Sequence, residues 1–256
     1  MASIPEPGRA VRRRQPRGDA SAALARLHRT VERCTRCADL GHLEAARPVM
    51  PEPRPAPVVL VGQAPGRVEL VRRRPFSGRA GGQLFRWLAR AGCRSEADAR
   101  ARIYVTSITK CYPGPALAGA GDRRPSSAEV ACCRPFLDRQ LELLRPRVVI
   151  AVGGLAQARF LSPRPLAELV GRCFDAAGGE VPVLPARDPA SGPPAGRPAA
   201  PEAPRPWVVP LPHPSGASRW LNRAEHAALL DRALAILAVL LGVELVRVGA
   251  GAGPAR

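Results

Sequence analysis

The sequence predicts an α/β protein, a three-layer α/β/α sandwich around a central, mainly parallel, four-stranded sheet. Two observations predict this class. Four short apolar runs lie at residues 58–61, 103–106, 148–152 and 207–211, and continuous apolar runs of this length are typical of strands buried on both faces of a parallel sheet. Segments with helical periodicity separate the runs, which indicates right-handed crossover connections.

The expected helices carry apolar residues at helical spacing. They span residues 21–34, 82–91, 127–144 and about 223–241. The proline-rich stretch 47–57 cannot propagate a helix or a central strand, so it is expected to be a linker that enters the first strand.

The chain of 256 residues can bury one good core, and we expect a single domain over residues 20–248. Residues 1–19 are expected to form a disordered basic tail, and residues 249–256 a second tail. Residues 176–206 consist mainly of Pro, Ala, Gly and Arg, which predicts a long, partly disordered insertion before the last strand.

The formal net charge of +18 favours a polyanionic partner such as nucleic acid. Lys110 is the only lysine, and the abundance of Arg, Ala, Gly and Pro is also what GC-rich coding would produce, so coding bias is an alternative explanation of the charge. The sequence shows no secretory signal and no run of about 18 apolar residues. We therefore expect a cytoplasmic protein without membrane contact, in which paired thiols bind metal or act in catalysis more often than they form disulfides.

Four of the seven cysteines have the arrangement of a metal site, a Cys-x-x-Cys pair followed by two isolated thiols. Such a pair can be redox-active, bind zinc or hold half of an iron–sulfur cluster. Cys93 and Cys173 have no partner pattern and are expected to be small buried hydrophobic residues. The four candidate ligands are Cys34, Cys37, Cys111 and Cys133.

Two loops follow predicted strands, at the carboxyl ends where ligands bind in open α/β sheets. Gly-Gln-Ala-Pro-Gly occupies residues 62–66, where the glycines allow close approach of the backbone to a ligand and the proline keeps the turn rigid. His-Pro-Ser-Gly occupies residues 213–216 after the last strand. Taken singly, the first loop is also compatible with an ordinary turn, and His213 with a structural histidine.

The two loops resemble those of the uracil-DNA glycosylase superfamily, in its iron–sulfur branch of families four and five. Two further motifs carry the same resemblance, Arg-Pro-Phe-Ser-Gly-Arg-Ala-Gly at residues 74–81 and Lys-Cys at 110–111. The resemblance runs from about Cys34 to Leu241 in the same order. It implies a monomeric base excision repair enzyme that hydrolyses the N-glycosidic bond of a flipped-out uracil, or a related deaminated base, and leaves an abasic site in DNA. The alternative is a module with the same fold and cluster that binds damaged DNA without cleaving it.

The resemblance implies a 4Fe-4S cluster on Cys34, Cys37, Cys111 and Cys133. Cys132 stands beside Cys133 and leaves the fourth ligand open between the two, although the Cys-Arg-Pro that begins at Cys133 matches the family pattern. Zinc is the alternative metal.

The resemblance also assigns roles at the site. His213 and backbone N–H groups of residues 63–66 are expected to stabilise the departing base anion, and Phe76 is expected to stack on the base. The residues expected to contact the base are Gln63, Ala64, Pro65, Gly66, Phe76, Ser107 and His213, and those expected to contact DNA beside it are Ser215, Gly216, Arg219 and Trp220.

Two positions depart from the family-four pattern. Gln63 replaces a glutamate, and because an amide cannot act as a general base, Gln63 is expected to position water while Glu69 is the remaining acidic candidate beside His213. Ser107 replaces an asparagine that reads the edge of uracil, and a serine offers a single hydroxyl. The preferred base is therefore left open among uracil, hypoxanthine and xanthine.

Overall fold

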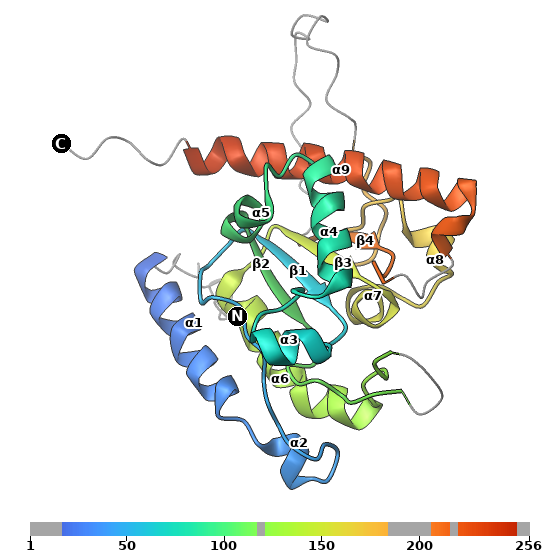
Figure 1. The fold of residues 1–256 in the computed structure, drawn as a ribbon. Helices are drawn as coiled ribbons and strands as arrows, with labels where there is room; N and C mark the ends of the chain where they lie inside the picture. The colour runs from blue at the N-terminus through green and yellow to red at the C-terminus, as the bar shows by residue number, and fades with distance from the viewer. Residues whose placement is uncertain (1–16, 117–120, 184–205, 216–219, 250–256) are drawn as a thin grey trace, which may run out of the picture.

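The computed structural model describes residues 17–116, 121–183, 206–215 and 220–249 of the chain. In these segments four parallel strands form one sheet in the order β2-β1-β3-β4, with helices on both faces (Figure 1). The predicted three-layer α/β/α fold is confirmed. The strands are β1 (Val58–Gly62), β2 (Ile103–Ser107), β3 (Val148–Val152) and β4 (Trp207–Leu211).

The strand register brings the functional loops to one edge of the sheet. Gly62 of β1 pairs with Ser107 of β2, and Val152 of β3 pairs with Leu211 of β4. Every strand is parallel to its neighbours, so all four carboxyl ends meet at this edge. Ligands of open α/β sheets bind beyond such an edge, which makes it the place to look for the site.

The two faces of the sheet have separate cores. Val58 and Leu60 point to one face and Val59 and Val61 to the other, because successive side chains of a strand alternate. One face is covered by α4 (Arg79–Arg90), α5 (Glu96–Arg102) and α9 (Ala224–Gly249), and the other by α1 (Arg17–Glu32), α6 (Ser127–Leu144) and α7 (Gly154–Phe160).

Several short elements are not predicted from the sequence, because a helix of one or two turns is too short to show a helical repeat of apolar residues. They are α2 (Arg36–Asp39), α3 (Arg67–Arg72), α5, α7, α8 (Leu166–Leu169) and the 3₁₀ turn η1 (Trp220–Asn222). Of these, α2 and α3 matter for function, since α2 carries a candidate metal ligand and α3 begins directly after residue 66.

Some expected boundaries are wrong. The helix α1 begins at Arg17, inside the expected N-terminal tail, and α9 continues to Gly249. The expected insertion also starts too early, because Glu180 pairs with Phe174 in an isolated β-bridge. The remainder of the two tails and of the insertion lies outside the described residues. No helix within the described part of the chain is long and apolar enough to span a membrane.

Candidate active site and cysteine site

The loops that follow β1 and β4 face each other across the end of β3. Two strand spacings separate them, about 10 Å. Between them β3 is followed by Gly153, which has a φ of +81°, and a Cβ on this residue would stand 3.3 Å from Cδ2 of His213. The missing side chain lets the His213 ring lie against the end of β3.

The His213 ring has a defined tautomer in its neutral form. The backbone N–H of Ser215 donates to Nδ1 over 3.3 Å, and the Ser215 hydroxyl lies 2.9 Å from the same nitrogen. Because an amide nitrogen can only donate, Nδ1 is an acceptor and the ring proton is on Nε2. Burial lowers the pKa of His213 below its ordinary value. The side chain therefore presents a neutral Nε2–H donor at the carboxyl edge.

Phe76 is held against the loop of residues 62–66. Its backbone is in the left-handed region with a φ of 52°, and a Cβ on Gly62 would stand 2.5 Å from Cζ of its ring. The guanidinium of Arg100 donates to the Phe76 carbonyl over 3.0 Å. Gly81 faces that same carbonyl, which lies 1.9 Å from where a Cβ on Gly81 would be. Two glycines and one arginine thus fix the position of the ring.

Glu69 links the two loops that surround Phe76. One carboxylate oxygen accepts the N–H of Gly66 over 3.0 Å, and the other accepts the N–H of Gly78 over 2.7 Å. The first of these bonds also caps the N-terminus of α3. Both carboxylate oxygens already accept hydrogen bonds from backbone N–H groups. The geometry therefore favours a role for Glu69 in positioning the loops, rather than the free catalytic carboxylate expected from the sequence.

Ser107 is buried and uses its hydroxyl internally, donating to the Thr109 carbonyl over 2.7 Å. The following segment is tied to the first loop, because the N–H of Ile108 donates to Gly62 O over 2.9 Å and that of Thr109 to Gln63 O over 3.2 Å. In this conformation the Ser107 hydroxyl has no proton left to donate to a base. The segment instead supports the backbone of the 62–66 loop.

The remaining expected DNA contacts are only partly described. Trp220 stacks on His226 with ring centroids 4.1 Å apart and planes 4° from parallel, and it packs partly buried against the α9 face of the core. Ser215 is engaged with His213. Gly216 and Arg219 lie outside the described residues.

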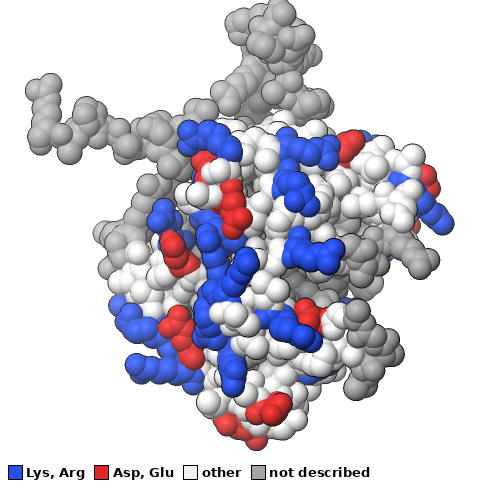
Figure 2. Space-filling view, viewed as in Figure 1, with Lys and Arg blue, Asp and Glu red and all other residues white. Residues whose placement is uncertain are grey.

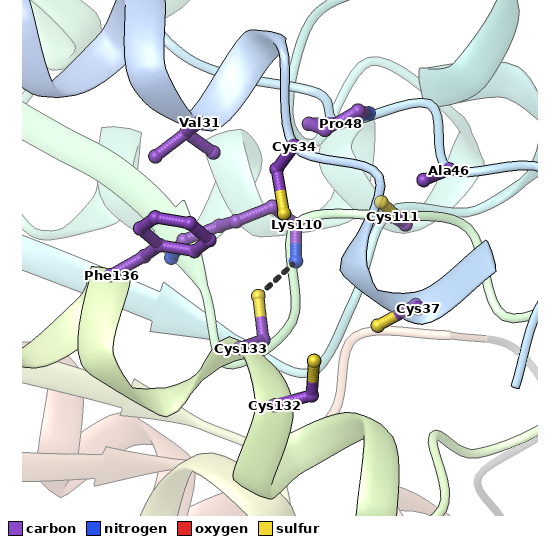
Figure 3. A pocket seen from close by; sticks show the side chains of 10 residues that line it. All are labelled: Val31, Cys34, Cys37, Ala46, Pro48, Lys110, Cys111, Cys132, Cys133 and Phe136. Atoms are coloured by element: carbon purple, nitrogen blue, oxygen red, sulfur yellow. Dashed lines mark hydrogen bonds between the residues drawn. The ribbon is translucent and has the colours of Figure 1, made fainter. Parts of the chain in front are cut away.

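The four candidate ligand cysteines come together around one pocket, and Cys132 joins them (Figure 3). They come from three parts of the fold, the turn after α1 and helix α2, the segment after β2, and α6. Burial, together with the neighbouring thiols, raises the pKa values of Cys37 and Cys111 to about 12. As expected, Cys93 and Cys173 are instead buried in the apolar core.

The donor chemistry of the pocket is compatible with a cluster. The thiols line a pocket whose other walls include Val31 and Phe136. Within the described segments, no group of three or more His, Cys, Asp or Glu side chains is arranged to hold a metal ion. Thiolate sulfur in an apolar surrounding is the ligand environment of iron–sulfur clusters.

Lys110 is a functional candidate that the sequence analysis missed. It is 1% exposed, and its backbone N–H donates to Cys133 Sγ over 3.3 Å. Its ammonium donates to Thr106 Oγ1 over 2.9 Å and to the Ser107 carbonyl. Burial lowers the pKa of Lys110 to about 8, and the Cys133 thiolate acts in the opposite direction. Nothing in the spacing of one lysine beside a cysteine reveals that its side chain turns inward.

Arginine side chains gather on the face that contains α3 and α4 (Figure 2). These helices flank the loop that carries Phe76, so the basic side chains lie next to the carboxyl edge of the sheet. The exposed arginines of α3, α4 and the loop between them are Arg67, Arg72, Arg73, Arg74, Arg79, Arg86 and Arg90.

The fold and the two sites define a class of protein. It is an α/β/α domain with a glycine-rich loop and a histidine loop at the carboxyl edge of a parallel sheet, and it also has a cysteine-lined pocket. The chain belongs to the uracil DNA glycosylase superfamily, whose family model matches residues 51–238. This confirms the family expected from the sequence.

Relatives of two types are similar to the chain. It is 34% identical over 155 residues to the type-4 uracil-DNA glycosylase of Pyrobaculum aerophilum, covering 60% of this chain and 70% of that protein. It is 32% identical over 153 residues to the type-4 uracil-DNA glycosylase of Thermotoga maritima, covering 59% of this chain and 73% of that protein. The type-5 uracil-DNA glycosylase of P. aerophilum is 35% identical over 111 residues, or 40% of this chain and 46% of that protein.

Proposed function

We propose that the chain is a DNA N-glycosylase that excises uracil, or a related deaminated base, and leaves an abasic site. The observation that carries this proposal is the neutral His213 ring, which presents its Nε2–H opposite the 62–66 loop at the carboxyl edge of the sheet. Membership of the uracil DNA glycosylase superfamily and the type-4 and type-5 relatives support the same chemistry.

In this reaction the bond between the sugar and the base breaks while negative charge develops on the base. A donor aimed at that charge contributes about 3–4 kcal/mol to catalysis. His213 donates through Nε2–H, and because the ring is already neutral, no proton has to leave it first. Backbone N–H groups of the 62–66 loop supply further donors, and Phe76 provides the aromatic face on which the extruded base stacks.

DNA binding is the role we assign to the basic face around α3 and α4. A net charge of +18 and exposed arginines beside the site suit a polyphosphate, because each neutralised phosphate releases counterions. The affinity for DNA should therefore fall steeply as salt is added.

We assign the cysteine site to a 4Fe-4S cluster held by Cys34, Cys37, Cys111 and Cys133. A cluster there would supply a structural brace, since its ligands would join α1, α2, α6 and the segment after β2. A single zinc ion would require four sulfurs about 2.3 Å from one point, and the described thiols instead surround a pocket.

The activity is tested with oligonucleotides that carry one uracil, hypoxanthine or xanthine, single- or double-stranded, followed by alkaline cleavage. We expect strand scission with at least one base, a rate about 100- to 1,000-fold lower in His213→Ala, and none with an undamaged oligonucleotide. Binding without scission on every substrate would refute the enzyme and favour the lesion-binding module.

The cluster is tested separately from the activity. The purified protein should be brown, with broad absorbance near about 400 nm, and should contain iron rather than zinc. Cys133→Ala should lose the colour and Cys132→Ala should keep it. The opposite result would make Cys132 the fourth ligand, and a colourless zinc protein would refute the cluster.

A further inference from the structure

The proposed reaction needs a group that orients and deprotonates the attacking water, and neither residue considered so far supplies one. Gln63 carries an amide, which does not accept a proton at neutral pH. Glu69 is a carboxylate, but both of its oxygens accept backbone N–H groups, from Gly66 and from Gly78. A water-activating carboxylate must therefore come from elsewhere in the fold.

Asp122 places a carboxylate directly against the 62–66 loop. Its Oδ2 lies 2.6 Å from the position that a Cβ on Gly66 would occupy. No side chain other than that of glycine leaves room for it. The two residues are 56 positions apart in sequence, so only the fold brings them together.

The backbone of Asp122 is anchored and its carboxylate is exposed. Asp122 pairs with Pro115 in an antiparallel bridge, and the N–H of the next residue, Arg123, donates to the Gly114 carbonyl over 3.0 Å. The Asp122 side chain is exposed to solvent, next to Tyr112. A fixed backbone with an exposed carboxylate suits a group that must meet a substrate.

The titratable neighbours of Asp122 are an arginine next to it in sequence and two groups from other segments. Arg123 is bound to Glu129 through two hydrogen bonds of 2.7 and 2.8 Å, so its charge is already paired. The other two groups are Arg67 and Tyr112. Burial raises the pKa of Tyr112, and the interaction with Asp122 acts in the same direction.

We propose that Asp122 is the catalytic carboxylate of this site, which orients the attacking water and accepts its proton. The bond from C1′ of the sugar to the base nitrogen breaks, and its electron pair leaves with the base as an anion. A water oxygen forms the new bond to C1′ and gives its proton to Asp122. The negative carboxylate also stabilises the positive charge that develops on the sugar. This inference rests on the proposed glycosylase function.

The test compares single-turnover excision by the wild-type chain, Asp122→Ala and Asp122→Asn, with Glu168→Gln as a control that also removes one exposed negative charge. General base catalysis contributes about 100- to 10,000-fold, so Asp122→Ala should lose at least about 100-fold and Glu168→Gln should match the wild type. Sodium formate should restore part of the lost rate in Asp122→Ala, because a free carboxylate can enter the vacated space. It should not restore Asp122→Asn, whose amide fills that space.

The outcomes separate the two proposals. A wild-type chain that cleaves no substrate refutes the glycosylase function itself. A wild-type chain that cleaves, with Asp122→Ala equally fast, refutes only the role of Asp122. A loss of rate in Asp122→Ala that formate does not restore also overturns the proposal, since it would indicate a positioning role without proton transfer.

Discussion

Replacing Gly81 with alanine should displace the Phe76 ring from the base site. The new Cβ would stand 1.9 Å from the Phe76 carbonyl oxygen, whereas carbon and oxygen in contact stay about 3.3 Å apart. The carbonyl must therefore retreat by about 1.4 Å. That shift also breaks its hydrogen bond with Arg100. Because misplacement by about 1 Å can cost about 100-fold in rate, excision should fall by about that factor.

Gly82→Ala is the matched control. Gly82 is the next residue of the same helix, and its Cβ would have only the Arg86 guanidinium nearby, at 3.9 Å. Alanine in a helix is more favourable than glycine by about 1 kcal/mol, whereas overpacking costs about 1–3 kcal/mol. The helix gain applies to both variants, so Gly81→Ala should be less stable than Gly82→Ala by about 1–3 kcal/mol, or about 2–12 °C in unfolding midpoint.

Both variants are measured by thermal unfolding and by single-turnover excision of uracil. The reasoning about Phe76 would be refuted if Gly81→Ala unfolded at the same temperature as Gly82→Ala and excised uracil as fast. Loss of rate in Gly82→Ala as well would show that the helix, rather than the Phe76 carbonyl, is responsible.

Three further predictions concern buried groups. Burial and the Lys110 charge lower the pKa of His28 to about 4 from 6.5, so between these values the unfolded chain binds a proton that the folded chain does not. Stability should fall as the pH drops from 6.5 to 4, by up to about 3 kcal/mol, and urea unfolding of His28→Gln should lack this component. If the proposed cluster is bound, Lys110→Met should make it harder to reduce, because a nearby positive charge is removed. A redox titration followed by absorbance measures this, and an unchanged potential would exclude a charge effect. Arg100→Lys should raise KM more than it lowers kcat, because it loosens the Phe76 loop without touching the reacting atoms, and equal effects on both would contradict this.

The sequence was sufficient for the sheet and for the location of the site. All four strands are buried, mainly apolar runs. Burial on both faces favours one arrangement for such runs, a central parallel sheet. The residues at the strand ends, Gly62 and His213, follow directly from that topology. The apolar spacing over residues 127–144 likewise predicts α6, which spans Ser127–Leu144.

The roles of individual carboxylates could not be predicted in this way. Glu69 and Asp122 are both acidic loop or helix-end residues in the sequence, and spacing does not distinguish them. Their difference arises from which backbone N–H groups face them. Glu69 accepts hydrogen bonds from two such groups and supports the loops. Asp122 instead lies against Gly66, where no side chain stands in its way. Only tertiary packing decides between these cases.

The segment from Thr106 to Cys111 connects the cysteine site with the base site. At one end its N–H groups hold the carbonyls of Gly62 and Gln63, and at the other Cys111 lines the cysteine pocket. Lys110 lies between them with a buried ammonium that donates to the neutral oxygens of Thr106 and Ser107. A buried cation without an anion is costly, and among the described residues the acidic group that acts on it is the Cys133 thiol. Deprotonation of that thiol on binding a cluster would supply the missing negative charge. The same lysine would then fix the segment that supports the 62–66 loop, so that loss of the cluster should weaken base binding even though no cysteine touches the base.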